Sequence, residues 1–513
     1  MYENKLPKQA ESLWLKQPAS KYSELKESIE TKVAIVGGGI TGITAAYLLA
    51  KAGIQTVLIE ADKIVHGTTG HTTAKISAQH GLIYNQLIED LGIEKASLYY
   101  QANAEAMNLI AVLIKEHKIN CNYEKQDAYV YTNDMDKLDQ LDAEYKAYET
   151  LGIKGELLAQ MPLDIPHKAA IKMPNQAQFH PVKYVQALAV EAAKKGAQLF
   201  ENTPAVDIEY GSKPNIILRN GLKITCEHAI IASHYPFWDK NGLFFAKMEP
   251  QRSYVNAIKS PLKYPGGMYI NAEQPTRSIR KMDTDQGELW LIGGDSHKTG
   301  QGETEIKHVE ALQNFADQHF QAEETSYRWS AQDPVTLDHV PYIGQVTDSK
   351  KNIWIATGYA KWGMTQGTIA AKHLCNSILG KDSPYGKLYN PSRFEGKETI
   401  KNTVTYNMDT AKHLVKSKLD LQNEDIDHLE TDQAAVTRIN GQRTGAYKDE
   451  HDKLFLVDTT CTHLGCEVNW NSGERSWDCP CHGSRFSYTG EVLEGPATRP
   501  LKRIDSINHN DRN

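Results

Sequence analysis

The first apolar segment of the chain is short and ends in three glycines. Residues 32–36 form a β-branched run, residues 40–52 have the pattern of a helix, and residues 56–60 form a second apolar run. Short apolar runs bounded by turn residues are typical of buried strands, and the order strand, helix, strand is typical of a βαβ unit. The sequence therefore predicts that an α/β domain begins here.

Helix and strand patterns continue through the middle of the chain and then change. Residues 184–195 have the pattern of an amphipathic helix, and residues 229–233 and 353–358 form two further apolar strands that close on small-residue turns. Around residues 381–396 Pro, Gly, Ser and Asn accumulate, which indicates the exit from a domain. Beyond residue 426 the short strands and turns predict a small all-β domain.

Composition and charge narrow the classes of protein. The chain has 513 residues, 40% of them hydrophobic and 24% charged, so two or three globular domains are expected. A formal net charge of −7 argues against a general nucleic-acid binder. The most apolar stretch, residues 33–52, is interrupted by glycines and threonines, and the N-terminus lacks the apolar core of a signal peptide. We therefore expect no integral membrane segment and a cytoplasmic location.

Four of the seven cysteines crowd into residues 461–481. One residue separates Cys461 from His463, and two residues separate Cys479 from His482. A Rieske [2Fe–2S] cluster binds two cysteines on one iron and two histidines on the other, so two loops that each supply one Cys and one His fit it. A structural zinc site is the alternative, because zinc also binds two cysteines and two histidines.

This segment resembles the Rieske proteins of quinol-oxidising complexes. The resemblance rests on Leu-Gly after His463, on Pro-Cys-His-Gly-Ser at residues 480–484 and on a proline-bearing loop at residues 490–501. Phe486 departs from the family, which has a tyrosine there that bonds a ligand sulfur, so we expect a lower potential than in those complexes. The resemblance implies a cluster held by Cys461, His463, Cys479 and His482, and a disulfide between Cys466 and Cys481.

A glycine motif follows the first predicted strand. Gly37, Gly39 and Gly42 form G-x-G-x-x-G, and Glu60 lies at the end of the second strand. The glycines permit a tight turn, a close approach to a pyrophosphate and close packing of helix on strand, while the acid can bond ribose hydroxyls. Strand, glycines and acid together predict a dinucleotide site, and a glycine-rich turn without function is the alternative.

The loop at residues 67–75 is small and rich in hydroxyls, and it resembles the second FAD-binding loop of the D-amino-acid oxidase and glycine oxidase superfamily. Residues 202–206, Ala232 and residues 358–365 resemble further FAD-binding segments of that superfamily. The resemblance implies an α/β, Rossmann-like FAD-binding domain with an interleaved antiparallel-sheet substrate domain. The residues expected to bind FAD are Gly37, Gly39, Ile40, Thr41, Gly42, Glu60, Ala61, Gly67, Thr68, Thr69, Gly70, His71, Thr72, Thr73, Ala74, Lys75, Val206, Ala232, Gly358, Gly363, Met364 and Thr365.

Five side chains are candidates for more specific roles. Similarity to dimethylglycine-dehydrogenase-like relatives suggests a covalent bond from His71 to the flavin, with hydrogen bonding as the alternative. Lys75 is a candidate catalytic cation near the flavin, or else a surface lysine, and Trp362 is a candidate pocket wall or a packing residue. Arg280 and Arg328 could bind a substrate carboxylate.

As a whole, the chain resembles bacterial flavoproteins of the Bacillus type with a fused C-terminal Rieske domain. We expect an FAD-dependent oxidoreductase at residues 1–383, a connector at residues 384–425 and the Rieske domain at residues 426–513. The resemblance implies a dehydrogenase of small amines or amino acids that passes electrons from FAD to the cluster and on to an external acceptor. A flavin oxidase that uses oxygen, a non-enzymatic redox sensor or electron-transfer protein, and a Rieske oxygenase are the alternatives.

Overall fold

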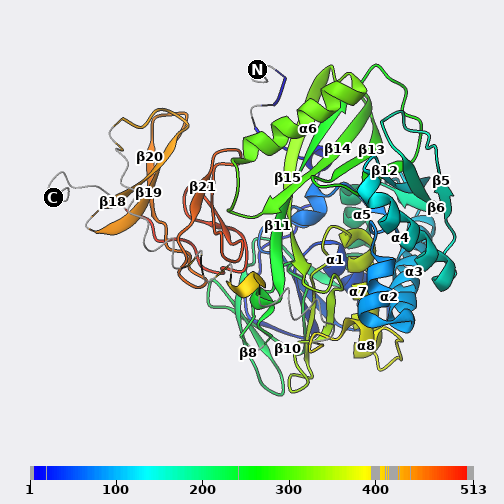
Figure 1. The fold of residues 1–513 in the computed structure, drawn as a ribbon. Helices are drawn as coiled ribbons and strands as arrows, with labels where there is room; N and C mark the ends of the chain where they lie inside the picture. Colours follow the sequence, from blue (N-terminus) through cyan, green and yellow to red (C-terminus); the bar gives the residue numbers. More distant parts are fainter. Residues whose placement is uncertain are drawn as a thin grey trace.

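The computed structural model describes residues 5–393 apart from 8, 19 and 241, residues 405–408, 410, 412 and 414, and residues 426–504 apart from 427 and 440. Figure 1 shows a large body built from the first part of the chain, and a smaller β domain, coloured orange to red, on one side of it.

One sheet of the body is mainly parallel. Its strands are β1 (Ile29–Val36), β2 (Thr56–Ile59), β7 (Gln198–Phe200), β8 (Ala205–Glu209), β9 (Asn215–Leu218), β10 (Lys223–Ile231), β16 (Tyr342–Gln345) and β17 (Ile353–Thr357). The order is β16-β17-β10-β1-β2-β7, and the hairpin of β8 and β9 joins at β10. β1 runs parallel to β2 and β10, with Ala34 opposite Val57 and Ala229. The predicted βαβ start and the two later apolar strands are confirmed.

Three helices pack together beside this sheet. α1 (Ile40–Lys51) contacts both α5 (Pro181–Lys194) and α7 (Gly363–Ile378). Ile43 and Tyr47 of α1 are fully buried. α5 begins earlier than the pattern predicted, because Pro181 occupies its first turn and the His180 side chain accepts a hydrogen bond from the Lys183 N–H.

The second sheet of the body is mainly antiparallel. Its strands are β3 (Lys75–Ile76), β4 (Glu124–Thr132), β5 (Glu156–Leu158), β6 (Ala169–Gln178), β11 (Met248–Lys259), β12 (Met268–Asn271), β13 (Arg277–Thr284), β14 (Gly287–Lys298) and β15 (Glu324–Thr336). They follow the order β15-β11-β14-β13-β12-β4-β6-β3, with β5 beside β6. Because the chain alternates between the two sheets, the expected interleaved antiparallel domain is confirmed.

The remaining helices pack on the two sheets or on one another. They are α2 (Tyr84–Leu91), α3 (Ile93–His117), α4 (Leu138–Leu151), α6 (Glu305–Phe320) and α8 (Gly386–Tyr389), with the short 3-10 turns η1 (Leu13–Lys16), η2 (Thr68–His71), η3 (Met135–Lys137) and η4 (Phe244–Ala246). α6 contacts β11 and β14, and α3 contacts α7.

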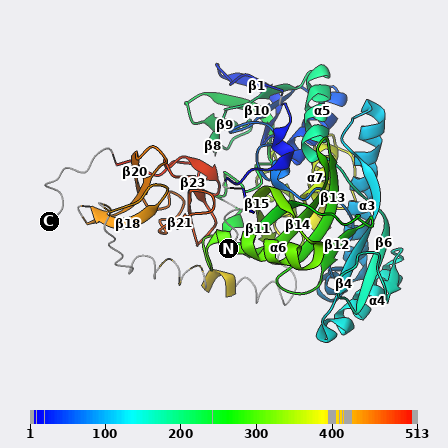
Figure 2. The same cartoon turned by 90° about the horizontal axis from the view of Figure 1, so that it is seen from above.

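The smaller domain contains two antiparallel sheets. One is formed by β18 (Ala434–Ile439), β19 (Gln442–Lys448) and β20 (Leu454–Asp458), and the other by β21 (Asn469–Asn471), β22 (Ser476–Asp478), β23 (Arg485–Ser487) and β24 (Val492–Glu494). Trp477 and Phe486 are opposite each other on β22 and β23 and are fully buried. Figures 1 and 2 show the first sheet far from the body and the second next to it. The predicted all-β domain is therefore confirmed.

Most of the expected connector lies outside the described residues. None of the helices in the described ranges is long and apolar enough to cross a membrane. The cytoplasmic location stays a prediction.

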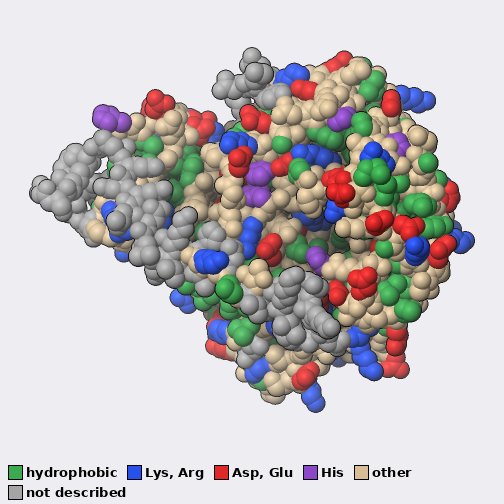
Figure 3. Space-filling model, viewed as in Figure 1, with side chains coloured by type: hydrophobic (Ala, Val, Ile, Leu, Met, Phe, Trp, Pro, Cys, Tyr) green, Lys and Arg blue, Asp and Glu red, His purple; other side chains and the backbone are tan. Residues whose placement is uncertain are grey.

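On the face shown in Figure 3, acidic and basic side chains are interspersed rather than separated by sign.

Candidate functional site

A cavity of about 370 Å³ has walls from both sheets of the body and from the smaller β domain. The turn after β1, the loop at residues 65–73 and the β-domain loop at residues 492–498 all contribute to it. Many residues expected to bind FAD lie in its wall: Gly37, Gly39, Ile40, Thr41, Glu60, Ala61, Gly67, Thr68, Thr69, His71, Thr72, Thr73, Lys75, Ala232, Gly363 and Met364. The structure thus brings segments from distant parts of the chain to one site.

The glycine turn after β1 lets the backbone come close to its neighbours and to a bound pyrophosphate. Gly37 has φ +116°, and a Cβ atom there would lie 2.4 Å from the Ala232 carbonyl oxygen. A Cβ atom at Gly42 would lie 1.9 Å from the Gly37 carbonyl oxygen, so helix and strand are in contact at this point. The N-cap residue of α1, Gly39, has no side chain to cap the helix, and the Ile40 N–H donates to the Thr69 hydroxyl at 3.1 Å. The positive dipole end of the helix still favours an anion here. This arrangement fits a pyrophosphate.

Glu60 lies beside this turn. Its carboxylate accepts hydrogen bonds from the Gly38 N–H at 2.7 Å and from the Asp62 N–H at 3.0 Å. Burial raises the pKa of Glu60, and the two N–H donors oppose that effect. Because each carboxylate oxygen can accept more than one hydrogen bond, the group can still receive ribose hydroxyls from the cavity. The first half of the dinucleotide site therefore fits FAD.

Six predicted FAD-binding residues lie outside the cavity lining: Gly42, Gly70, Ala74, Val206, Gly358 and Thr365. Several of these have packing roles instead. A Cβ atom at Gly70 would lie 2.4 Å from the Val65 carbonyl oxygen, and one at Gly358 would lie 2.4 Å from the Thr336 side chain. Next to Val206, Pro204 and Ala205 form the wall, and the contact of Val206 with adenine stays a prediction.

Lys75 and Trp362 both line the cavity. The Lys75 ammonium donates to the Tyr269 carbonyl oxygen at 3.0 Å and to the Ser278 hydroxyl at 2.5 Å. Burial, with a smaller contribution from the nearby Arg280 cation, lowers the pKa of Lys75 to about 7. Trp362 stacks on His80, with ring centroids 4.4 Å apart. Lys75 is therefore not a surface lysine, and its catalytic role stays a prediction.

His71 also lines the cavity, and its orientation is fixed by one hydrogen bond. The Nδ1 atom lies 2.9 Å from the Gly67 carbonyl oxygen, so it carries the proton and donates. Burial lowers the pKa of His71, which favours a neutral ring. The other nitrogen, Nε2, keeps its lone pair. A covalent bond to the flavin stays a prediction.

The expectation that Arg280 or Arg328 binds a substrate carboxylate is corrected by the structure. Arg280 is 1% exposed and donates to the Thr73 and Ala74 carbonyl oxygens, both at 2.9 Å. Arg328 donates to the Pro7 carbonyl oxygen at 2.8 Å. Neither side chain lines the cavity. Both guanidinium groups are used to hold backbone segments together.

The four predicted cluster ligands lie together at the end of the β domain nearest the body. The thiols of Cys461 and Cys479 are in hydrogen-bond contact, which lowers the pKa of Cys461 to about 7 and raises that of Cys479. The rings of His463 and His482 have centroids 5.1 Å apart. Burial lowers the pKa of His463 to about 4 and that of His482 to about 3, so both rings are neutral, as ligands must be.

One buried atom of this site points to a metal. His463 Nδ1 is buried and has no hydrogen-bond partner among the described residues. A buried nitrogen without a partner is costly unless something else binds it. Two thiols in contact and two neutral imidazoles next to each other, supplied by the same two loops, fit a [2Fe–2S] cluster, in which His463 Nδ1 would be a ligand of iron.

Cys466 and Cys481 form the expected disulfide, with a Cα–Cα distance of 6.5 Å. Their sulfur atoms lie within 4.8 Å of the Cys479 sulfur. The disulfide joins the two ligand loops and leaves exactly the two remaining thiols of the segment for iron. Ser484 adds a further link, because its hydroxyl accepts a hydrogen bond from the Ala497 N–H of the proline loop at 3.0 Å.

The histidine side of this site packs against the body. The Phe245 ring lies 5.1 Å from the His482 ring and 5.4 Å from the His463 ring, edge to face in both cases. The Gln332 amide donates to the Gly483 carbonyl oxygen at 2.8 Å. Gln332 lines the cavity and Gly483 follows His482, so one hydrogen bond connects the cavity wall to the ligand loop.

The β-domain wall of the cavity could not be found from sequence. Residues 492–498 belong to the proline loop, and in sequence they suggest only a loop near the cluster. Their place in the cavity depends on how the two domains pack, and no local pattern records that. His234 and Asp333 line the cavity from the body, and no sequence pattern pointed to them either, whereas Lys361 lies within the expected segment 358–365.

Comparison with known proteins agrees with both sites. Residues 32–377 match the family described as FAD dependent oxidoreductase, and residues 420–505 match the Rieske [2Fe-2S] domain. The second match decides between the cluster and zinc. The chain is 44% identical over 484 residues to YhfW of Bacillus subtilis, whose name describes a Rieske 2Fe-2S iron-sulfur protein, covering 94% of this chain and 95% of that protein.

More distant relatives match the body alone. Gamma-glutamylputrescine oxidoreductase of Escherichia coli is 22% identical over 383 residues, which cover 71% of this chain and 87% of that enzyme. The crystal structure of glycine oxidase from Geobacillus kaustophilus superposes with a TM-score of 0.61 at 20% identity, over 72% of this chain and all of that chain. The chain therefore belongs to the FAD-dependent oxidoreductase family, with a C-terminal Rieske domain, and is an oxidoreductase whose cofactors are FAD and a [2Fe–2S] cluster.

Proposed function

We propose that the protein is a dehydrogenase of amines or amino acids that passes electrons from FAD to the Rieske cluster and on to an external acceptor. When bound, FAD removes two electrons from a C–H bond beside an amine, and the cluster accepts one electron at a time. The observation that carries the proposal is the common wall, because residues 492–498 of the Rieske domain line the same cavity as the dinucleotide turn.

Several side chains support direct transfer between the two sites. Gln332 links the cavity wall to Gly483 through a 2.8 Å hydrogen bond. Phe245 covers the rings of His463 and His482 on the side of the body. Both contacts join the ligand loop to the body beside the cavity, which supports electron transfer between the two sites.

The charges in the cavity favour a substrate that carries both signs. Lys75 and Lys361 line it, and so do the carboxylates of Asp333 and Glu494. Such a wall can bind an ammonium group and a carboxylate of one small molecule. The names of two relatives, a gamma-glutamylputrescine oxidoreductase and a glycine oxidase, agree with an amine or amino-acid substrate.

The test is an anaerobic panel of amines and amino acids added to the purified holoprotein. Flavin absorbance and the EPR signal of the reduced cluster are recorded on the same samples. We expect at least one compound to bleach the flavin and to produce the cluster signal, while Cys461→Ala shows flavin bleaching alone. Flavin bleaching in the wild type without any cluster signal would refute the relay. Rapid peroxide release in air would favour the flavin oxidase instead.

A further inference from the structure

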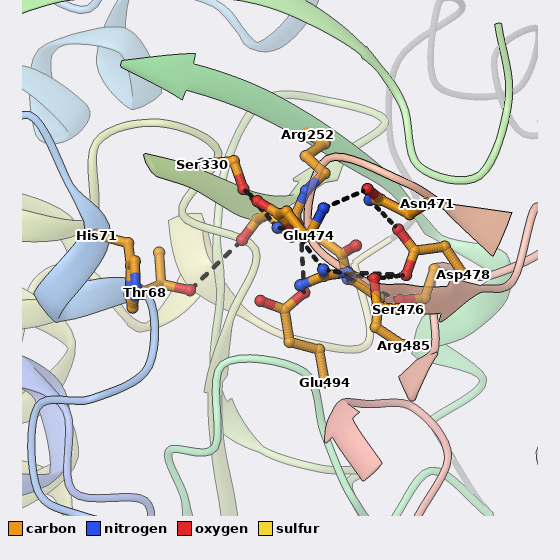
Figure 4. A network of polar contacts seen from close by, with 12 residues as sticks. Thr68, His71, Arg252, Ser330, Asn471, Glu474, Ser476, Asp478, Arg485 and Glu494 are labelled. Carbon is orange, nitrogen blue, oxygen red and sulfur yellow. Dashed lines mark hydrogen bonds and ion pairs between the residues drawn. The ribbon is translucent and has the colours of Figure 1, made fainter. Parts of the chain in front are cut away.

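A cluster of buried charges joins the Rieske domain to the body next to the cavity (Figure 4). Arg252 of β11 is 3% exposed, and it donates to Glu474 of the Rieske domain and to Ser330 of β15. Ser330 in turn donates to Glu474. The other side of the Arg252 guanidinium lies 3.4 Å from the Glu494 carboxylate, which lines the cavity.

Within the Rieske domain, Arg485 completes this network. It contacts Glu474, and it donates to Asp478 at 3.0 Å and to Ser476 at 2.9 Å. Asn471 donates to the second oxygen of Asp478 at 2.8 Å. Each partner of Glu474 is thus held by another group, and the Glu474 carboxylate is one of the points at which the two domains meet.

We propose that Arg252 is a positioning residue: its buried bridge to Glu474 and Glu494 holds the Rieske domain in one docked position, with the ligand loop against the cavity wall. This inference rests on the proposed electron relay. It adds that the cluster receives electrons in this position without a movement of the domain.

The physical reason is the cost of separating buried charges. An arginine fork that bonds carboxylates on two sides accepts only a narrow range of geometries, so it fixes orientation as well as distance. Removal of one partner leaves an uncompensated charge in a water-poor interface, which is strongly unfavourable. Burial would raise the pKa of Glu474, but Arg252 and Arg485 lower it to about 2, so the carboxylate stays charged.

Other contacts across the same interface require the same position. Gln301 donates to the Pro480 carbonyl oxygen at 2.9 Å, and Asn469 donates to the Gly300 carbonyl oxygen at 3.1 Å. A Cβ atom at Gly483 would lie 2.5 Å from the Pro250 side chain. The interface therefore brings backbone against backbone around the ligand loop, and Arg252 fixes the side of it nearest the cavity.

The experiment is laser-flash photoreduction of FAD in the purified holoprotein, with EDTA as electron donor under argon. One electron then leaves the reduced flavin and reduces the cluster, and both absorbances are followed in time. In Arg252→Met and in Glu474→Gln we expect this transfer to slow by about tenfold or more, since a broken buried bridge lowers the docked population. Arg252→Lys keeps the charge without the fork and should restore part of the rate.

The double variant Arg252→Met/Glu474→Gln tests whether the two residues act through one bridge. Its transfer rate should be no lower than that of the slower single variant, because each change alone already breaks the bridge. FAD content, the EPR line shape and the cluster potential should remain those of the wild type, which separates positioning from damage to either site.

Glu491→Gln is the matched control. Glu491 pairs with Arg219 across the same interface, but both side chains are more than 40% exposed, so its loss should change the rate little. Unchanged transfer in both Arg252→Met and Glu474→Gln, or rates that fall multiplicatively in the double variant, would overturn the inference while leaving the relay intact. Absence of transfer in the wild type would instead overturn the proposed function.

Discussion

Gly42 shows how one missing methyl group permits cofactor binding. A side chain here would meet the Gly37 carbonyl oxygen at 1.9 Å, so helix α1 would have to move away from the turn that faces the pyrophosphate. Such overpacking costs about 1–3 kcal/mol. We expect Gly42→Ala to weaken FAD binding by about tenfold or more, measured as the flavin released on dilution. Gly211→Ala, where the nearest atom would lie 3.5 Å away, should leave FAD binding unchanged.

Lys75 gives the site a dependence on pH. Burial lowers the pKa of Lys75 to about 7, so the side chain is charged below that pH and neutral above it. A nearby cation stabilises the reduced, anionic flavin. Lys75→Met should therefore lower the two-electron midpoint potential of the flavin at pH 6 by about 30 mV, equivalent to about 1.4 kcal/mol, and have little effect at pH 9.

Lys75→Arg serves as the control for that measurement, because an arginine stays charged across the range. It should keep the higher flavin potential and remove the part of the pH dependence that comes from the titration of Lys75. Equal potentials for wild type and Lys75→Met at pH 6 would show that the ammonium does not act on the flavin.

At the scale of single residues, the functional residues that could be predicted from the sequence are those that lie close together along the chain. The cluster ligands lie in two short segments, and the glycines of the dinucleotide turn follow one another, so both could be identified from spacing. Arg280 was misjudged because its partners, the Thr73 and Ala74 carbonyls, lie more than 200 residues away in sequence. The sequence alone does not reveal that the guanidinium of an arginine already donates its hydrogen bonds to backbone carbonyls.

At the scale of elements, the two ligand loops depend on the bond between Cys466 and Cys481. A disulfide that closes a loop of 15 residues contributes about 3 kcal/mol in the chain-entropy account. We expect Cys466→Ser/Cys481→Ser to lose iron and acid-labile sulfide several times faster than the wild type during incubation with a chelator. Cys121→Ser, a change at a buried free thiol in the body, should lose them at the wild-type rate. Equal rates in all three proteins would show that the disulfide has no part in holding the cluster.

The turn η4 shields the histidine ligands. Phe245 is half-buried and touches both rings, whereas its neighbour Leu243 is 52% exposed. Phe245→Ala should raise the rate at which ferricyanide oxidises the reduced cluster by about threefold or more, because a direct path to the rings opens. Leu243→Ala should not change that rate. If Phe245→Ala behaves like the wild type, the ring does not limit access to the cluster.

At the scale of the whole molecule, the fold class followed from the βαβ start and the late short strands, and both are present. The way the domains meet could not be predicted. The bridge from Arg252 to Glu474 joins residues 222 positions apart in sequence, and each residue taken alone has the pattern of an ordinary surface charge. Only the packing of the Rieske domain against β11 and β15 buries them.

This packing also changes what loss of the cluster should do to the flavin site. The dinucleotide turn belongs wholly to the body, whereas residues 492–498 complete the cavity from the Rieske domain. We expect Cys461→Ala to lose iron and sulfide but to keep FAD, because the pyrophosphate and ribose contacts remain. Iron analysis and the flavin absorbance of the purified variant check this. Loss of FAD together with iron would mean that the two sites depend on each other for assembly.

The most direct test is whether electron transfer from FAD to the cluster is a first-order step within one chain. After a single flash that reduces FAD in the wild-type holoprotein, we predict that the flavin reoxidises and the cluster is reduced at the same first-order rate, independent of protein concentration. A rate that rises in proportion to protein concentration, or a cluster that stays oxidised while the flavin remains reduced, would contradict it.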